Sequence, residues 1–89
     1  MKLNFPNPCR SFDDRGKRVR FWGYDSTIEV SFFVEVEALQ KLCPDMRHTE
    51  NELLKAFDSV REHIHEVAEK IHAHGPRGSF SHTLAAEDF

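Results

Sequence analysis

The sequence has few of the residues on which small extracellular or membrane proteins depend. Its only cysteines, Cys9 and Cys43, lie far apart and outside any CxxC motif, whereas a disulfide-stapled chain of this size needs several pairs. No uninterrupted apolar run exceeds that of Phe32–Val34, which is too short to cross a bilayer. Asn and Pro interrupt the N-terminal stretch where a signal peptide needs an apolar segment. We therefore expect two free thiols, no membrane partner and a cytoplasmic protein.

The remaining composition is that of one globular domain. The chain has 89 residues, of which 39% are hydrophobic and 30% charged. A chain of this length can form one hydrophobic core but not a second. Charge is distributed unevenly along the chain. Residues 1–24 carry six Lys or Arg against two Asp, whereas residues 25–89 carry six Lys or Arg against thirteen Asp or Glu. A basic N-terminal part and an acidic remainder suit self-association or binding to a charged partner.

Period-two alternation marks the sheet. The segments Lys17–Tyr24 and Thr27–Val34 both alternate apolar and polar side chains, which predicts a β-hairpin within a meander over residues 9–34. A tight turn precedes it, with Gly16 expected to supply a positive φ. The apolar face of the hairpin comprises Val19, Phe21, Ile28, Val30 and Phe32. Residues 1–8 should form an extended arm, because two prolines disfavour helix there.

Helical periodicity follows the hairpin. Residues 35–43 predict a short helix that Pro44 ends, and residues 49–74 predict a long one. A capping box begins the long helix at Thr49, and Gly75-Pro76 ends it. At about 1.5 Å per residue its length would be roughly 38 Å. Alternation returns over 78–84, which predicts a final strand, and 85–89 form a tail.

The expected fold is therefore a single α+β domain over residues 1–89. A small antiparallel sheet, made of a hairpin or meander and a C-terminal strand, packs one face against one short and one long helix. The edge of the sheet that the C-terminal strand joins stays undecided.

Histidine is abundant, but its spacing does not indicate a metal site. The long helix carries four of the six histidines: His63, His65, His72 and His74. No two are four residues apart, the spacing that lets imidazoles share a zinc ion. We expect them to border the apolar stripe, with polar tips in water. The sequence also contains no nucleophile motif and no phosphate-binding glycine loop, so we predict no catalytic, metal or cofactor-binding residue and leave an enzyme with a site not visible in the sequence as an alternative.

The aromatic and basic residues of the hairpin are the best functional lead. The candidate interaction face comprises Arg18, Arg20, Trp22, Tyr24 and Phe33. Trp, Tyr and Arg are enriched at binding hot spots, which favours a non-catalytic interaction or self-association module with an unknown protein or a second copy as partner. Single-stranded nucleic acid binding through Lys17–Tyr24 is the alternative, and the acidic net charge argues against it. Simple cross-strand pairing, of Arg18 or Arg20 with Glu29 and of Trp22 with Phe33, explains the same residues without any function.

Several segments resemble a known family of short bacterial proteins, the domain of unknown function fourteen eighty-eight. The resemblance runs nearly end to end and is carried by LNFPNP, SFD, VRFWGYDS, EVSFFVE, PDM, LLKAFDSVR, GSF and AAEDF. It implies a compact α+β domain and a cytoplasmic bacterial protein. It implies no activity, cofactor or site residue, and neither the histidines nor the cysteines contribute to it.

Overall fold

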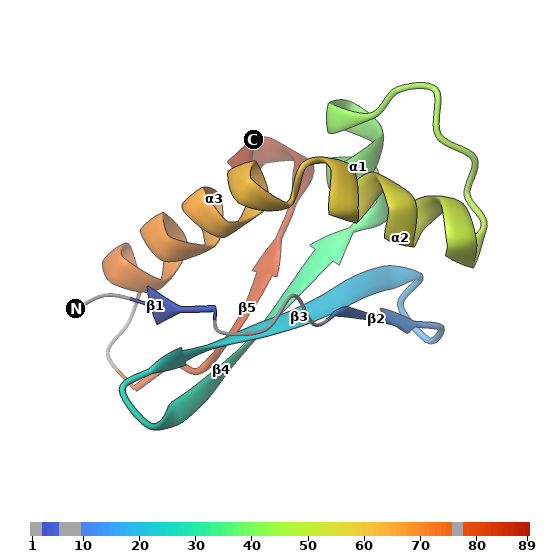
Figure 1. Cartoon of the computed structure of the whole chain (residues 1–89). Coiled ribbons are helices and arrows are strands. Elements are labelled where there is room, and N and C mark those ends of the chain that lie inside the picture. Colours follow the sequence, from blue (N-terminus) through green and yellow to red (C-terminus); the bar gives the residue numbers. More distant parts are fainter. Residues whose placement is uncertain (1–2, 6–9, 76–77) are drawn as a thin grey trace.

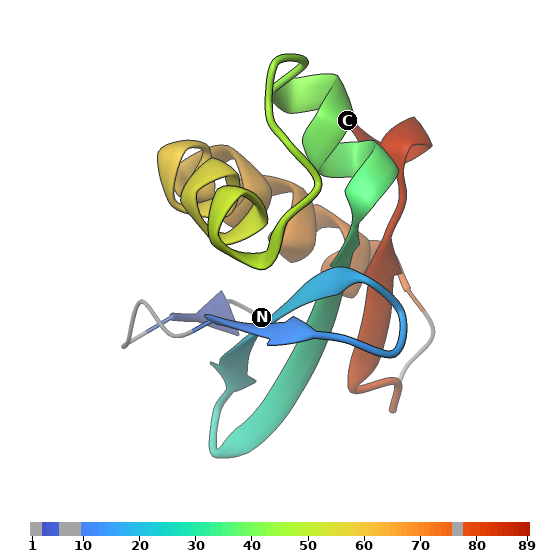
Figure 2. The same cartoon turned by 90° about the vertical axis from the view of Figure 1, so that its right-hand side faces the viewer.

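The computed structural model describes residues 3–5, 10–75 and 78–89 (Figure 1). These residues form one sheet and three α-helices, which confirms the predicted α+β fold. Most of the predicted arm, together with Cys9 and Pro76, lies outside the described residues. The helices all lie on one side of the sheet (Figure 2).

Within the described ranges the sheet has five strands. They are β1 (Leu3–Asn4), β2 (Arg10–Asp13), β3 (Arg18–Asp25), β4 (Ile28–Glu35) and β5 (Ser81–Leu84). The spatial order is β1-β3-β4-β5, and β2 pairs with β3 as well. Because β1 pairs with the end of β3 and β2 with its beginning, both short strands flank the same edge of β3.

The central β3–β4 hairpin follows the predicted alternation. Phe21 pairs with Phe32 and Val19 with Val34, and all four side chains are fully buried beneath the helices. Ile28 is the exception among the predicted apolar residues, because it lies beside the hairpin turn and is 48% exposed. The β2–β3 turn also differs from the prediction, since Lys17 rather than Gly16 takes the positive φ, at 48°.

The last strand runs parallel to its neighbour, so the predicted antiparallel sheet is antiparallel in most of its pairings and parallel in this one. Ser31 of β4 pairs with Ser81 of β5, and the pairing continues in parallel to Leu84. The predicted strand over 78–84 is shorter than expected, spanning Ser81–Leu84. Its direction follows from the crossover, because the helices between β4 and β5 carry the chain back to the end of the sheet where β4 began.

The predicted long helix over 49–74 is broken into two. Helix α1 spans Val36–Leu42, α2 spans Glu50–Ser59 and α3 spans Arg61–His74. Thr49 caps α2 by accepting a hydrogen bond from the Glu52 amide at 3.3 Å. The chain leaves helical geometry at Val60, whose φ and ψ are −121° and 20°.

Local hydrogen bonding accounts for the break. The Ser59 hydroxyl donates to the Ala56 carbonyl at 2.8 Å, a back-bond that bends helices. The break lets Phe57 of α2 and Ile64 of α3 both reach the core, where each is completely buried.

The chain ends in a single 3₁₀ turn, η1 (Ala86–Asp88), and Phe89 packs against the core. Within the described parts of the chain, no helix combines the length and apolar character needed to cross a membrane.

Candidate functional site

The five residues of the candidate interaction face lie together on the side of the sheet opposite the helices. Alternation along β3 places Arg18, Arg20, Trp22 and Tyr24 on this side, and Phe33 of β4 pairs with Arg20. We call this side of the sheet the open face, because no described helix covers it (Figure 2). All five side chains are partly buried by one another and by their neighbours.

Each arginine of the open face lies over an aromatic ring. The Arg18 guanidinium carbon lies 4.0 Å from the centroid of Phe33, and that of Arg20 lies 4.7 Å from the centroid of Trp22. These are cation–π contacts, each worth about 0.5–1 kcal/mol at exposed sites. The predicted stacking of Trp22 with Phe33 is thus replaced by two arginine–aromatic pairs. Tyr24 pairs across the strands with Glu29 and Asn4.

Carboxylates neutralise both arginines. Arg18 Nε lies 2.8 Å from Asp13 Oδ2, and Arg20 lies 3.3 Å from Glu29. Arg20 also donates to the Ser31 hydroxyl at 3.0 Å. The hydrogen bond from Arg18 holds the pKa of the Asp13 carboxyl below its usual value. The predicted pairing of Arg20 with Glu29 is therefore present, and the open face has little excess charge of either sign.

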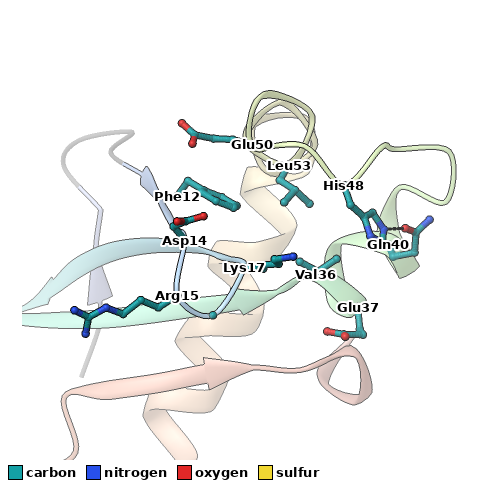
Figure 3. Close-up of a pocket in the computed structure, with 11 residues that line it drawn as sticks. Phe12, Asp14, Arg15, Lys17, Val36, Glu37, Gln40, His48, Glu50 and Leu53 are labelled. Carbon is teal, nitrogen blue, oxygen red and sulfur yellow. Dashed lines mark hydrogen bonds between the residues drawn. The ribbon is translucent and has the colours of Figure 1, made fainter.

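A pocket opens at one end of the molecule, on the side of the helices (Figure 3). It has a volume of about 820 Å³ and lies between the β2–β3 turn, α1 and the start of α2. Phe12, Val36 and Leu53 supply apolar walls, while Asp14 and Lys17 bring opposite charges. The volume suits a small ligand, but lining charges of both signs favour neither an anion nor a cation. Sequence patterns do not reveal this pocket, because its walls come from three separate segments.

A second cluster links α3 to the sheet. His72 Nε2 lies 2.9 Å from Asp25 Oδ2, and His72 Nδ1 lies 2.9 Å from His82 Nε2. Asp25 is 8% exposed and is the buried charged residue of the described chain. Burial lowers the pKa of His82, as does the nearby His72, and a backbone hydrogen bond with Ser79 partly offsets both.

The histidines of the helix are therefore not all simple border residues. His72 acts together with His82, a residue of the C-terminal strand, and this partnership was not predicted. His65 stacks flat on Phe5, with ring centroids 4.0 Å apart and planes 7° apart. Burial, and then the charge of Arg61, lowers the pKa of His65. Within residues 3–5, 10–75 and 78–89, no three His, Cys, Asp or Glu side chains converge in a way that could hold a metal ion.

Comparison with known proteins identifies a family and a fold. The family model described as "Protein of unknown function (DUF1488)" matches residues 3–81. The structure is similar to the crystal structure of a protein of unknown function from the DUF1488 family of Shewanella loihica PV-4, with a TM-score of 0.74 and 18% sequence identity over 90% of each chain. No match was found among curated proteins. At this identity the structural likeness establishes the fold alone.

Proposed function

The chain belongs to the DUF1488 family of proteins of unknown function, and from this premise we propose that it is a non-catalytic module that self-associates through the open face. The proposal includes a cytoplasmic location in a bacterium. The observation that carries it is the pairing of residues across β3 and β4, which makes the open face complementary to itself.

The complementarity follows from the register. On the open face the rows pair Arg18 with Glu35, Arg20 with Phe33, Trp22 with Ser31, and Tyr24 with Glu29. A half-turn about an axis parallel to the strands, midway between β3 and β4, lays β3 of one copy over β4 of the other. Every residue then faces the residue with which it is paired in its own chain. No row places like charges opposite each other. An isologous dimer interface requires this, because the same surface of both copies must be complementary to itself.

The chemistry of the rows supports binding. Arg18 would meet the partner's Glu35, and Arg20 would meet the partner's Phe33, so each contact is an ion pair or a cation–π pair. Tyr24 would offer its hydroxyl to the partner's Glu29. Packed sheets keep their strands within about 30° of one another, which suits an axis along the strands. Trp22, at the middle of the face, occupies the position where binding energy usually concentrates.

Nucleic acid binding through Lys17–Tyr24 has weaker support. A phosphate would have to displace Asp13 from Arg18 and Glu29 from Arg20, because both arginines are in ion pairs. The face therefore lacks the unpaired positive charge that drives binding to a polyanion.

Two charge reversals test the dimer. Arg18→Glu would place Glu opposite the partner's Glu35, and Glu35→Arg would place Arg opposite the partner's Arg18, so each variant alone should become monomeric. An equimolar mixture of the two variants should form a heterodimer, because every facing pair across the interface is then complementary. Light scattering coupled to size exclusion measures all three states.

Each variant keeps like charges at positions 18 and 35 of its own chain, in the mixture as well as alone. A dimer that forms only in the mixture therefore depends on contacts between chains and not on contacts within a chain. Glu66→Arg, an exposed charge reversal on α3, is the matched control and should leave the dimer intact. A wild-type monomer at high micromolar concentration would overturn the proposal, and so would variants that dimerise like the wild type. A change in Trp22 fluorescence on adding a single-stranded oligonucleotide, with no dimer, would favour the nucleic acid alternative.

A further inference from the structure

A chain of three titratable side chains fastens the C-terminal end of α3 to the sheet. Asp25 lies at the end of β3, His72 in the last turn of α3 and His82 in β5. The side chains of His72 and Asp25 are only 14% and 10% exposed. His72 occupies the middle of the chain, because both its ring nitrogens are within hydrogen-bond distance of a partner.

The number of protons in this cluster follows from its contacts. Each hydrogen bond takes one hydrogen, and the side chains make two such bonds: Asp25 with His72, and His72 with His82. Two neutral imidazoles supply these two hydrogens, so both bonds are made when neither ring carries an added proton. One added proton can be held on His82 Nδ1, the ring nitrogen outside these two bonds, without breaking either of them.

Further protonation must break the cluster. With another proton, both imidazoles carry hydrogen on every ring nitrogen, so His72 Nδ1 and His82 Nε2 become two donors facing each other across 2.9 Å. The two positively charged rings also repel each other. Neither ring can turn toward water without leaving the other.

The aromatic rings that contact the cluster do not offset that repulsion. The neighbouring strand β4 contributes the apolar ring of Phe32, whose centroid is 5.4 Å from that of His82. Phe80 lies on the other side, with its ring centroid 6.3 Å from that of His72. Among the described residues, Asp25 is the carboxylate that forms an ion pair with this cluster.

We propose that Asp25, His72 and His82 form an acid-opened clamp, which holds the C-terminal end of α3 on the sheet at neutral pH and releases it when a second proton binds. Opening detaches the last turn of α3 from β5 and exposes the ring of His82. The rest of the molecule stays folded, because Ile64 and Ala68, the residues of α3 that are buried in the core, precede the last turn.

Hydrogen exchange measured residue by residue tests the clamp. Amides near the end of α3, from Lys70 to Gly75, should open more often as pH falls below about 6.5, the ordinary pKa of histidine. After correction for intrinsic exchange, the opening constant should rise by up to about tenfold for each pH unit. Amides of α2, from Leu53 to Phe57, serve as the internal reference and should not follow this rise.

Substitutions identify the groups responsible. His82→Gln cannot take up a proton and should flatten the pH dependence at the end of α3. The matched control is His74→Gln, an exposed histidine of the same helix, which should leave that dependence unchanged.

Nitrogen chemical shifts of the histidine rings in the unmodified protein give a second measurement that does not depend on how a variant folds. We expect His72 and His82 to titrate as a coupled pair, in two separated steps. Independent titration of the two rings at the ordinary histidine value would overturn the clamp. So would exchange near Gly75 that does not change between about pH 7 and about pH 5.

Discussion

The two faces of the sheet use the same strands in opposite ways. On the helix side, Val19 and Phe21 of β3 are completely buried, and their contribution is the burial of apolar surface. On the open face, Arg18, Arg20 and Trp22 of the same strand are ordered by individual contacts with named partners. A close-packed core tolerates few substitutions. Residues in pairwise surface contacts can be substituted at a small cost in stability. One face therefore maintains the fold, and the other is available for recognition.

The largest difference should appear when one phenylalanine is removed from each face. Phe21→Ala should lower the free energy of unfolding by about 3–5 kcal/mol, because it leaves a cavity between Phe32 and Phe57. Phe33→Ala should cost about 1 kcal/mol, mainly through loss of the contact with Arg18. Urea unfolding of both variants measures the contrast. Equal losses would show that something covers the open face as completely as the helices cover the other.

An intermediate effect is expected at the margin of the covered face. Asp58 of α2 binds Arg10 of β2 through two hydrogen bonds and also binds Arg61 of α3. Asp58→Ala should cost about 1 kcal/mol, a modest value because the carboxylate is 40% exposed and solvent screens it.

The same residue makes that cost depend on pH. The hydrogen bond from Arg10 lowers the pKa of Asp58 below its ordinary value. The stabilisation is therefore complete above the ordinary carboxyl pKa and disappears as pH falls through the lowered one. Urea unfolding at neutral and at strongly acid pH should show a difference between wild type and variant only in the first case. A difference that persists in acid would mean that Asp58 contributes by packing.

The smallest effect should come from the open face itself. Arg20→Met removes the ion pair with Glu29 and replaces the cation–π contact with Trp22 by a sulfur–aromatic contact of similar strength, so the stability of the monomer should change by about 0.5 kcal/mol or less. Thermal unfolding of dilute protein measures this, and the response of the dimer to the same change is measured separately by light scattering. A large loss in the dilute monomer would contradict the separation of roles between the two faces.

Sequence periodicity predicted the hairpin because one face of it is buried. Val19, Phe21, Val30 and Phe32 can lie inside only in one register. The same alternation of side chains placed five residues on the other side of the sheet: Arg18, Arg20, Trp22, Tyr24 and Phe33. Which of these touch each other was not predictable, because alternation specifies a face and not the rotamer of an arginine.

Other features of the structure leave no periodic pattern in the sequence. The apolar stripe continues through Phe57, Val60 and Ile64 with one period, so the sequence does not reveal the break between α2 and α3. The four residues of β5 are too few to specify the direction of pairing. The clamp joins Asp25, His72 and His82 across large separations in sequence, and nothing in the neighbourhood of each predicts the other two.

The parallel pairing of β5 has a consequence for biosynthesis. Ser81 reaches Ser31 only after the intervening helices have been made, so a nascent chain exposes one edge of β4 until Ser81–Leu84 have left the ribosome. That edge belongs to the apolar segment Ile28–Glu35, which is the kind of strand that pairs with other chains when left uncovered. Glu29 and Glu35, the two charged residues of this strand, are of the type that opposes aggregation of an uncovered strand. Truncation before Ser81 should accordingly yield insoluble protein, although it removes little of the core.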